Sequence, residues 1–310
     1  MRLLAASLAV AVLAGAPAAG APKVFFPRDH YGHSAGIEWW YFTAYVRGSD
    51  GHRYSVFFTL FKRLNYLLPV SQVVNLDNGR IIKHTEKLIP GTINSKSVRF
   101  ISPAASFRYA ADRDTWIAAV TAPGYTLDFA AQPEKPYVLN GGGSGVIHQA
   151  TSTSWYYSAT RMTAGGVIRT GGKSVRFSGT AWFDHQWGNF ANDPSAMHWD
   201  WFSCRFDDRT ELMLYRFRDG RTNGTYVDDA GHATAVSGFE AVPGPRILKK
   251  TTRRWPIDWT LQVPTLQLNL ILRAFTANQF VHGTLLPTFW EGATSASGTK
   301  TGICFVEETS

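Results

Sequence analysis

Hydrophobic and polar residues alternate along much of this chain with the period of two that is typical of β-strands. The clearest runs are 37–47 and 53–62, which are rich in aromatic and β-branched residues and are separated by the turn sequence Gly48-Ser49-Asp50-Gly51. No long segment has a helical period. Short strands with turn residues between them favour a β-sandwich or β-barrel. Further strands are predicted at 70–76, 80–89, 97–101, 115–121, 125–130, 155–162, 175–184, 198–206, 211–218, 255–263, 267–272 and 302–306.

The predicted strands form two series, which we divide at a turn assigned to Ala164-Gly165-Gly166. We therefore expect an all-β protein with two domains, at residues 22–164 and 165–310. The chain has 310 residues, of which 45% are hydrophobic and 14% aromatic, so it can bury a sizeable core.

Charge changes this picture little. The formal net charge is +8, but the Lys and Arg residues are scattered and accompany no nucleic-acid-binding motif, so we expect no nucleic-acid partner. Residues 139–145 are glycine-rich but are followed by a predicted strand, which argues against a phosphate-binding loop. No spacing resembles a zinc site, and no G-x-S-x-G nucleophile motif occurs. We predict no cofactor and no metal.

The first 21 residues resemble a signal peptide, with Arg2, a short apolar region and small residues before a cleavage site. No later segment is apolar enough for a transmembrane span, so we expect an exported, periplasmic or secreted protein. The two cysteines, Cys204 and Cys304, could form a disulfide in that compartment or remain as buried thiols.

The candidate chemistry is concentrated in two stretches. Residues 179–206 combine histidine, acid and tryptophan at high density, and residues 33–42 form a smaller cluster of the same kind. We expect the two stretches to build one apolar cavity that contains a few ionisable groups. The ionisable and aromatic candidates are His33, Glu38, Trp40, Tyr41, Asp184, His185, Trp187, Trp199, Asp200 and Trp201.

Side chains alternate between the two faces of a strand. By this rule Glu38, His185 and Asp200 lie on the more apolar face of their strands, which should be the barrel interior, whereas Asp184 lies on the face opposite His185. Burial raises the pKa of a carboxyl group that has no compensating partner, so Glu38 or Asp200 could act as a general acid. Alternatively, both acids are structural and accept hydrogen bonds from tryptophans or pair with arginine, and the tryptophans belong to the core.

Several motifs resemble the AttH-like family, which is related to bacterial carotenoid 1,2-hydratase. They are His33 with Glu38-Trp39-Trp40-Tyr41-Phe42, Tyr156-Tyr157-Ser158, Trp182-Phe183-Asp184-His185-Gln186-Trp187-Gly188, Trp199-Asp200-Trp201-Phe202 and Trp290-Glu291-Gly292. The resemblance implies two lipocalin-like β-barrels in tandem and a cofactor-free activity on apolar, unsaturated molecules. It also implies that His185 and Trp187 belong to the site. We add Glu38 and Asp200 from strand alternation and the family pattern.

The leading hypothesis is a hydratase-like lyase that acts by acid–base chemistry on a hydrophobic, isoprenoid- or lipid-like alkene. Asp200 or Glu38 would donate a proton to carbon, and Trp187 and Trp199 would stabilise the cation. His185 would activate water, held by Asp184 if a bulge brings the two together. We assign substrate binding to Trp187, Trp199, Trp201, Trp40, Tyr41 and His33. The alternatives are a lipocalin-like carrier of an apolar ligand and a secreted hydrolase.

Overall fold

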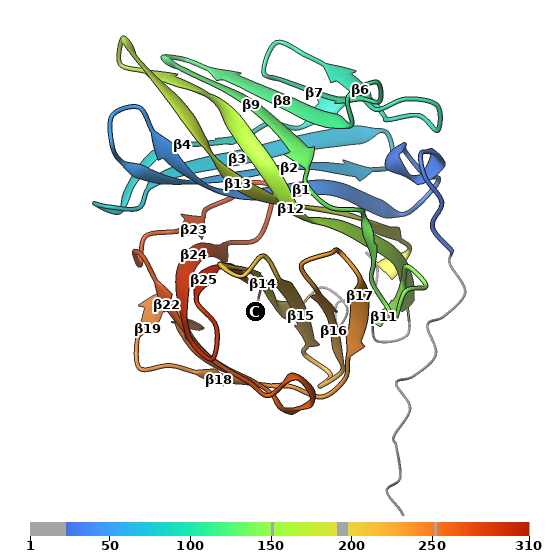
Figure 1. Ribbon diagram of the computed structural model, residues 1–310. Helices are drawn as coiled ribbons and strands as arrows, with labels where there is room; N and C mark the ends of the chain where they lie inside the picture. Colours follow the sequence, from blue (N-terminus) through green and yellow to red (C-terminus); the bar gives the residue numbers. More distant parts are fainter. Residues whose placement is uncertain (1–22, 150–151, 191–197, 251–252, 310) are drawn as a thin grey trace, which may run out of the picture.

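The computed structural model describes residues 23–149, 152–190, 198–250 and 253–309. Two curled antiparallel sheets lie one above the other (Figure 1), and the lower one is viewed along its barrel axis. The predicted all-β class with two lipocalin-like barrels is therefore confirmed. The predicted signal peptide lies outside the described residues. Among these residues, none of the helices is both long and apolar enough to cross a membrane.

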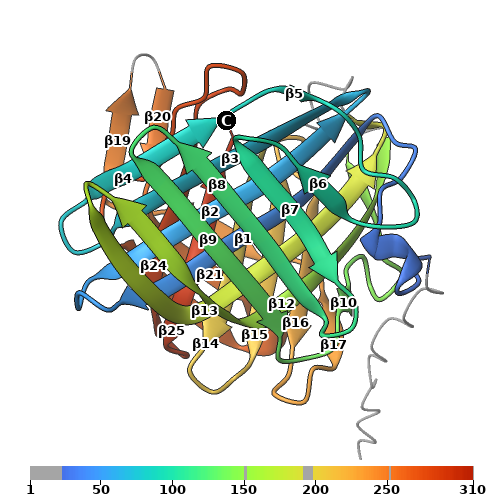
Figure 2. The same ribbon diagram turned by 90° about the horizontal axis from the view of Figure 1, so that it is seen from above.

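The first sheet has the strand order β4-β3-β2-β1-β13-β12-β9-β8-β7-β6. Figure 2 shows these strands from above, and the short helix η1 (Arg28–His30) precedes them. The small strands β5, β10 and β11 pair with β3 and β12 outside this order. The bounds are β1 (Ile37–Gly48), β2 (Arg53–Arg63), β3 (Tyr66–Asn75), β4 (Arg80–Glu86), β5 (Ile89–Pro90), β6 (Arg99–Ile101), β7 (Ala105–Ala110), β8 (Thr115–Ala122), β9 (Tyr125–Pro133), β10 (Val138–Leu139), β11 (Val146–Gln149), β12 (Ser152–Thr170) and β13 (Lys173–Gly188).

The second sheet has the order β17-β16-β15-β14-β25-β24-β22-β21-β18, with β23 paired to β24 and a separate β19–β20 hairpin. A short helix, η4 (Pro264–Leu266), joins β21 to β22. The bounds are β14 (Trp199–Phe206), β15 (Glu211–Phe217), β16 (Thr222–Val227), β17 (Ala233–Val236), β18 (Glu240–Pro243), β19 (Ile247–Lys250), β20 (Arg253–Pro256), β21 (Asp258–Val263), β22 (Leu268–Ala274), β23 (Phe280–Val281), β24 (Phe289–Gly298) and β25 (Gly302–Glu308).

The predicted boundary at residues 164/165 falls inside β12, and the two sheets divide between Gly188 and Trp199 instead. The glycines at 165 and 166 do not form a turn. A Cβ on Gly166 would lie 1.9 Å from the carbonyl oxygen of Asp128 and 2.6 Å from the Phe177 ring, so glycine here permits close strand packing. The chain turns at Gly171-Gly172, where both φ angles are positive.

Three hydrophobic cores follow from this arrangement. One fills the interior of the first sheet, one fills the interior of the second, and one lies between the two sheets. The first sheet is consequently buried on both faces where the second barrel covers it. This double burial decides where the candidate site residues lie.

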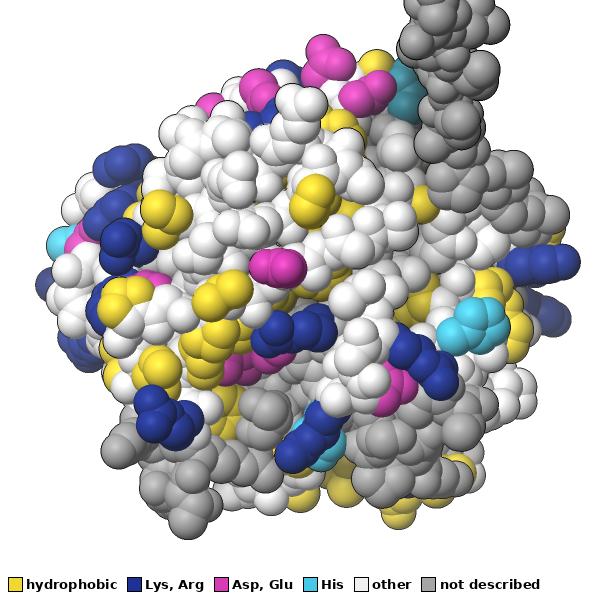
Figure 3. All heavy atoms as spheres, turned by 90° about the horizontal axis from the view of Figure 1, so that it is seen from below, with side chains coloured by type: hydrophobic (Ala, Val, Ile, Leu, Met, Phe, Trp, Pro, Cys, Tyr) yellow, Lys and Arg dark blue, Asp and Glu magenta, His cyan; other side chains and the backbone are white. Residues whose placement is uncertain are grey.

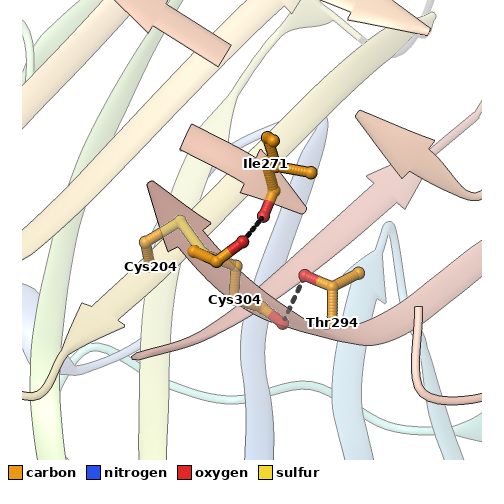
Figure 4. The surroundings of a disulfide bond; sticks show 5 residues. Cys204, Ile271, Thr294 and Cys304 are labelled. Carbon is orange, nitrogen blue, oxygen red and sulfur yellow. Dashed lines mark hydrogen bonds between the residues drawn. A yellow bond between two sulfur atoms is a disulfide. The ribbon is translucent and has the colours of Figure 1, made fainter. Parts of the chain in front are cut away.

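Cys204 and Cys304 are neighbours on β14 and β25 and form a disulfide (Figure 4). The bond lies in the core of the second barrel, beside Thr294, whose hydroxyl donates to the carbonyl oxygen of Cys304 at 3.2 Å. It joins residues 100 positions apart, and closing so long a loop in the unfolded chain stabilises a fold by roughly 2–4 kcal/mol.

Lys and Arg side chains are scattered on the face shown in Figure 3, among acidic and apolar side chains, rather than gathered in one continuous patch.

Candidate functional site

The candidate site lies inside the first barrel, where β1 and β13 run side by side. Trp40 pairs with His185 and Glu38 pairs with Trp187 across these strands. All four side chains face the barrel interior, as strand alternation predicts, and Glu38, Trp40 and His185 are completely buried.

Glu38 is the hub of this site. Its carboxylate lies 2.7 Å from Nδ1 of His33, 3.0 Å from Nε2 of His185 and 3.0 Å from Nζ of Lys62. It also accepts a hydrogen bond from the backbone N–H of His33. Burial alone would raise the pKa of Glu38, but the hydrogen bonds from the two histidines and the charge of Lys62 outweigh it and lower that pKa to about 2.

The low pKa of Glu38 is opposite to the direction that the sequence suggested. We had expected a desolvated, neutral acid on an apolar face. The partners of Glu38 come from other parts of the chain, and Lys62 is placed directly opposite it on β2. Glu38 is therefore a carboxylate at neutral pH.

His185 connects Glu38 to a second histidine. Its Nδ1 lies 3.2 Å from the Tyr157 hydroxyl, which lies 2.7 Å from Nδ1 of His30. Burial lowers the pKa of His185 to about 4 and that of His30 to about 3, so both are neutral imidazoles near pH 7. The contacts form a continuous hydrogen-bonded relay, defined as His33–Glu38–His185–Tyr157–His30.

Helix η1 places His30 at one end of this relay, where the N-terminal segment lies at the right-hand end of the upper sheet in Figure 1. Nε1 of Trp40 donates to the carbonyl oxygen of His30 at 3.1 Å, and the carbonyl oxygen of Asp29 lies 3.0 Å from Nδ1 of His185. The His30 ring is surrounded by aromatic rings, with centroids 4.7–5.6 Å away. They belong to Phe26, Tyr109, Trp116, Tyr137 and Tyr157.

The other end of the relay reaches the surface. The His33 side chain is 20% exposed and stacks on Trp187, with ring centroids 3.8 Å apart and planes 2° from parallel. Trp155 stacks beyond Trp187 at 6.3 Å. The relay thus runs from a partly exposed histidine, beside two indole rings, to a buried one.

Tyr41, Asp184, Trp199 and Trp201 lie elsewhere, in the core between the two sheets. Asp184 accepts hydrogen bonds from Ser158 at 2.5 Å, Trp182 at 2.7 Å and Tyr156 at 2.9 Å. The β1–β13 register is continuous along both strands, so no bulge brings Asp184 to His185. The remaining contacts in this cluster are Tyr41 with Glu291, Trp199 with Glu307 and Trp201 with Tyr156.

This second cluster consists of buried carboxyl groups. None of the contacts named above is with a positively charged side chain. Burial raises the pKa of Asp184 and that of Glu307 to about 7. Glu291 and Glu307 are direct cross-strand neighbours, and burial followed by repulsion from Glu307 raises the pKa of Glu291 well above its usual value. The arrangement is stable when these groups carry protons.

The raised pKa of Glu307 predicts how the stability of the protein depends on pH. Between about pH 4.5 and 7 the folded state holds a proton at Glu307 that the unfolded chain releases, so rising pH lowers the free energy of unfolding. Relative to Glu307→Gln, the wild type should lose about 1.4 kcal/mol per pH unit in this window. Urea unfolding at several pH values measures the difference. The exposed Glu240→Gln is the control, and a wild-type-to-Glu307→Gln difference that is independent of pH would contradict the assignment.

Asp200 lies in a third place, inside the second barrel. Its Oδ2 accepts two hydrogen bonds from Arg216, at 2.9 and 2.6 Å, and its cross-strand neighbour is Glu308. Burial raises the pKa of Asp200, and Arg216 opposes this rise. The structure therefore brings His33, Glu38, Trp40, His185 and Trp187 together and leaves Asp200, Asp184, Tyr41, Trp199 and Trp201 outside this group.

Sequence reasoning missed Asp29, His30, Lys62 and Tyr157. The position of Lys62 gave one signal, because it shares a strand face with Phe58 and Leu60, where alternation predicts an apolar residue. The sequence contained no comparable signal for His30.

One ligand-type atom each from His33, Glu38 and His185 lies within 4.8 Å of the others. The same three residues could therefore hold a metal ion in principle. The ammonium group of Lys62, 3.0 Å from the same carboxylate, would repel a divalent cation. We therefore interpret the cluster as a proton site.

Two clefts on the first sheet have volumes of about 560 and 390 Å³, and His185 lines neither of them. The expected apolar cavity around His185 is filled by aromatic side chains, including Trp40 at 4.6 Å and Trp187 at 4.8 Å between ring centroids.

Comparison with known proteins places this geometry in context. A model of the AttH-like family matches residues 92–310. A crystal structure of a Nitrosomonas europaea protein assigned as an AttH shares 22% identity with a TM-score of 0.82, covering 97% of this chain and 99% of the other. None of the curated proteins compared matches the chain.

Two further structures have the same fold. Kievitone hydratase from Nectria haematococca shares 17% identity with a TM-score of 0.78, covering 95% of this chain and 97% of its own. CghA in complex with Sch210972 shares 12% identity with a TM-score of 0.58, and 96% of each chain is covered. At these identities the structural likeness establishes the fold.

Proposed function

The chain belongs to the AttH-like family, and on that premise we propose that it is a cofactor-independent hydratase-type enzyme for an apolar, unsaturated small molecule. The observation that carries the proposal is the relay, in which the Glu38 carboxylate lies within 3.0 Å of each of two imidazoles, beside stacked indole rings. The likeness to kievitone hydratase supports the same reaction type. We further propose that residues 1–21 direct export.

Hydration of an alkene adds a proton to one carbon and a hydroxyl group to the other. His33, whose Nδ1 lies 2.7 Å from Glu38, would supply the proton, since a carboxylate stabilises the protonated form of a neighbouring imidazole. Trp155, which is partly exposed and stacks beyond Trp187, would stabilise the carbocation with its π face. Water then adds to the cation and returns one proton to the relay, so that atoms and charge balance without a co-reactant.

The relay has two ends, one at His33 and one at His30. Tyr157 joins them because a hydroxyl group can accept a proton from one imidazole while it donates its own to the other. The burial of His185 and His30 excludes water from the middle of the relay. A carrier of an apolar ligand would gain nothing from these buried polar groups, which are costly to desolvate.

Incubation in oxygen-18 water tests the proposal. Kievitone, a linear isoprenoid alkene and oleic acid are the probes, and mass spectrometry detects the product. We expect one probe to gain the mass of one labelled water with native protein and not with heat-denatured protein. A probe that binds tightly and is recovered without label would favour the carrier instead.

A further inference from the structure

A cleft of about 560 Å³ lies on the β6–β7 hairpin, at the edge of the first sheet. Figure 2 shows the two strands side by side at this edge. The cleft is lined by residues 97–101 and 106–109. Its volume is within the range of small-molecule sites.

Two arginines face each other across this hairpin. Arg99 on β6 and Arg108 on β7 are direct cross-strand partners, and both are exposed. Neither guanidinium has a carboxylate partner among the described residues, and the lining of the cleft contains no acid. Like charges directly opposite each other destabilise a strand pair, so an anion bound between them would be favourable. Guanidinium groups bind carboxylates in a bidentate manner.

The same face carries one exposed apolar residue beyond the arginines. Ile101 lies two residues after Arg99 on β6, opposite Ser106, and its side chain is 66% exposed. Phe100 and Tyr109 also line the cleft, but they belong to the opposite, inward face of the hairpin. Charge at one position and exposed apolar surface at the next fit a molecule with an anionic head and an apolar chain.

We propose that this cleft binds one amphiphilic anion, with a carboxylate between Arg99 and Arg108 and an apolar chain along Ile101. The binding goes beyond the proposed hydration and does not depend on it. Tyr109 also lines the cleft, and on the inward face of the hairpin its ring is 4.7 Å from that of His30. A membrane surface would call for a larger basic cluster, of about four to eight Lys and Arg residues.

Isothermal titration of the full chain with monomeric oleate tests the site, with oleyl alcohol as the uncharged comparison. We expect saturable binding of one oleate and at least about tenfold weaker binding of the alcohol. Arg99→Gln with Arg108→Gln should weaken oleate binding by about tenfold or more without loss of stability, because the substitutions remove a repulsion. Ile101→Ser should weaken oleate and the alcohol alike.

Arg273→Gln is the matched control, since Arg273 is exposed on β22 of the other barrel. Equal affinity for oleate and oleyl alcohol, or unchanged oleate binding in the double variant, would overturn the proposal. Binding to anionic vesicles without binding of monomeric oleate would assign the arginines to a membrane surface instead. Because titration requires no turnover, failure of the proposed hydration would leave the result intact, and the Glu38→Gln variant should still bind oleate.

Discussion

Glu38→Gln is expected to lower the hydration rate by about 10²–10⁴-fold, the usual contribution of a positioned acid–base group. Glutamine keeps the size of the side chain but lacks the negative charge that would stabilise a protonated imidazole formed beside it. The Nε2 atom of His185, 3.0 Å from this carboxylate, would lose its carboxylate partner. The substrate that gains oxygen-18 serves for the assay, and kcat is the quantity to compare.

The controls separate loss of chemistry from loss of folding. Glu38→Gln leaves Lys62 buried without its carboxylate, and an unpaired buried charge is destabilising. Adding Lys62→Met removes that charge, so the double variant should regain stability while activity stays low. Asp200→Asn makes the same kind of change in the other barrel and should retain activity. If Asp200→Asn abolished turnover and Glu38→Gln did not, the active site would lie in the second barrel.

Strand alternation predicted which face each candidate occupies. Glu38 and His185 face the interior of the first barrel, Asp200 shares its strand face with the interior residues Phe202 and Cys204 of the second, and Asp184 lies opposite His185. The rule works here because β1 and β13 pair without a bulge along their shared length. The period of two depends only on local backbone geometry, so a sequence is enough to apply it.

Alternation could not predict which strands meet or what covers each face. Asp200 was assigned to the same cavity as His185, but β14 belongs to the second sheet. The face of β1 that carries Tyr41 is buried by the second barrel, so Tyr41 donates a hydrogen bond to Glu291 instead of lining a cavity with His185. The relay likewise depends on contacts such as Tyr157 with His30, which lie 127 residues apart in the chain.

The carboxylate of Glu211 joins the two barrels, and its loss should cost more stability than that of any exposed pair. Glu211 is buried on β15 and lies 2.9 Å from Nζ of Lys135 and 2.6 Å from Nε of Arg161, both in the part of the chain that builds the first sheet. Thr160 also donates to it at 3.3 Å. Glu211→Gln would leave two buried cations without a counter-charge, which costs about 3–5 kcal/mol.

A nearby exposed pair provides the matched comparison. Glu134 and Arg209 also connect the two halves of the chain, at 3.2 Å, but the Arg209 side chain is 55% exposed. Water and salt screen such a pair, so Glu134→Gln should change stability by less than about 1 kcal/mol. Urea unfolding of both variants, followed by tryptophan fluorescence, measures the two effects. The contrast tests whether burial makes the Glu211 contact strong, since both substitutions remove one carboxylate from the junction of the barrels. Equal shifts in the unfolding midpoint of the two variants would show that burial does not strengthen the Glu211 contact. The apolar core between the sheets would then be the main contribution to their association.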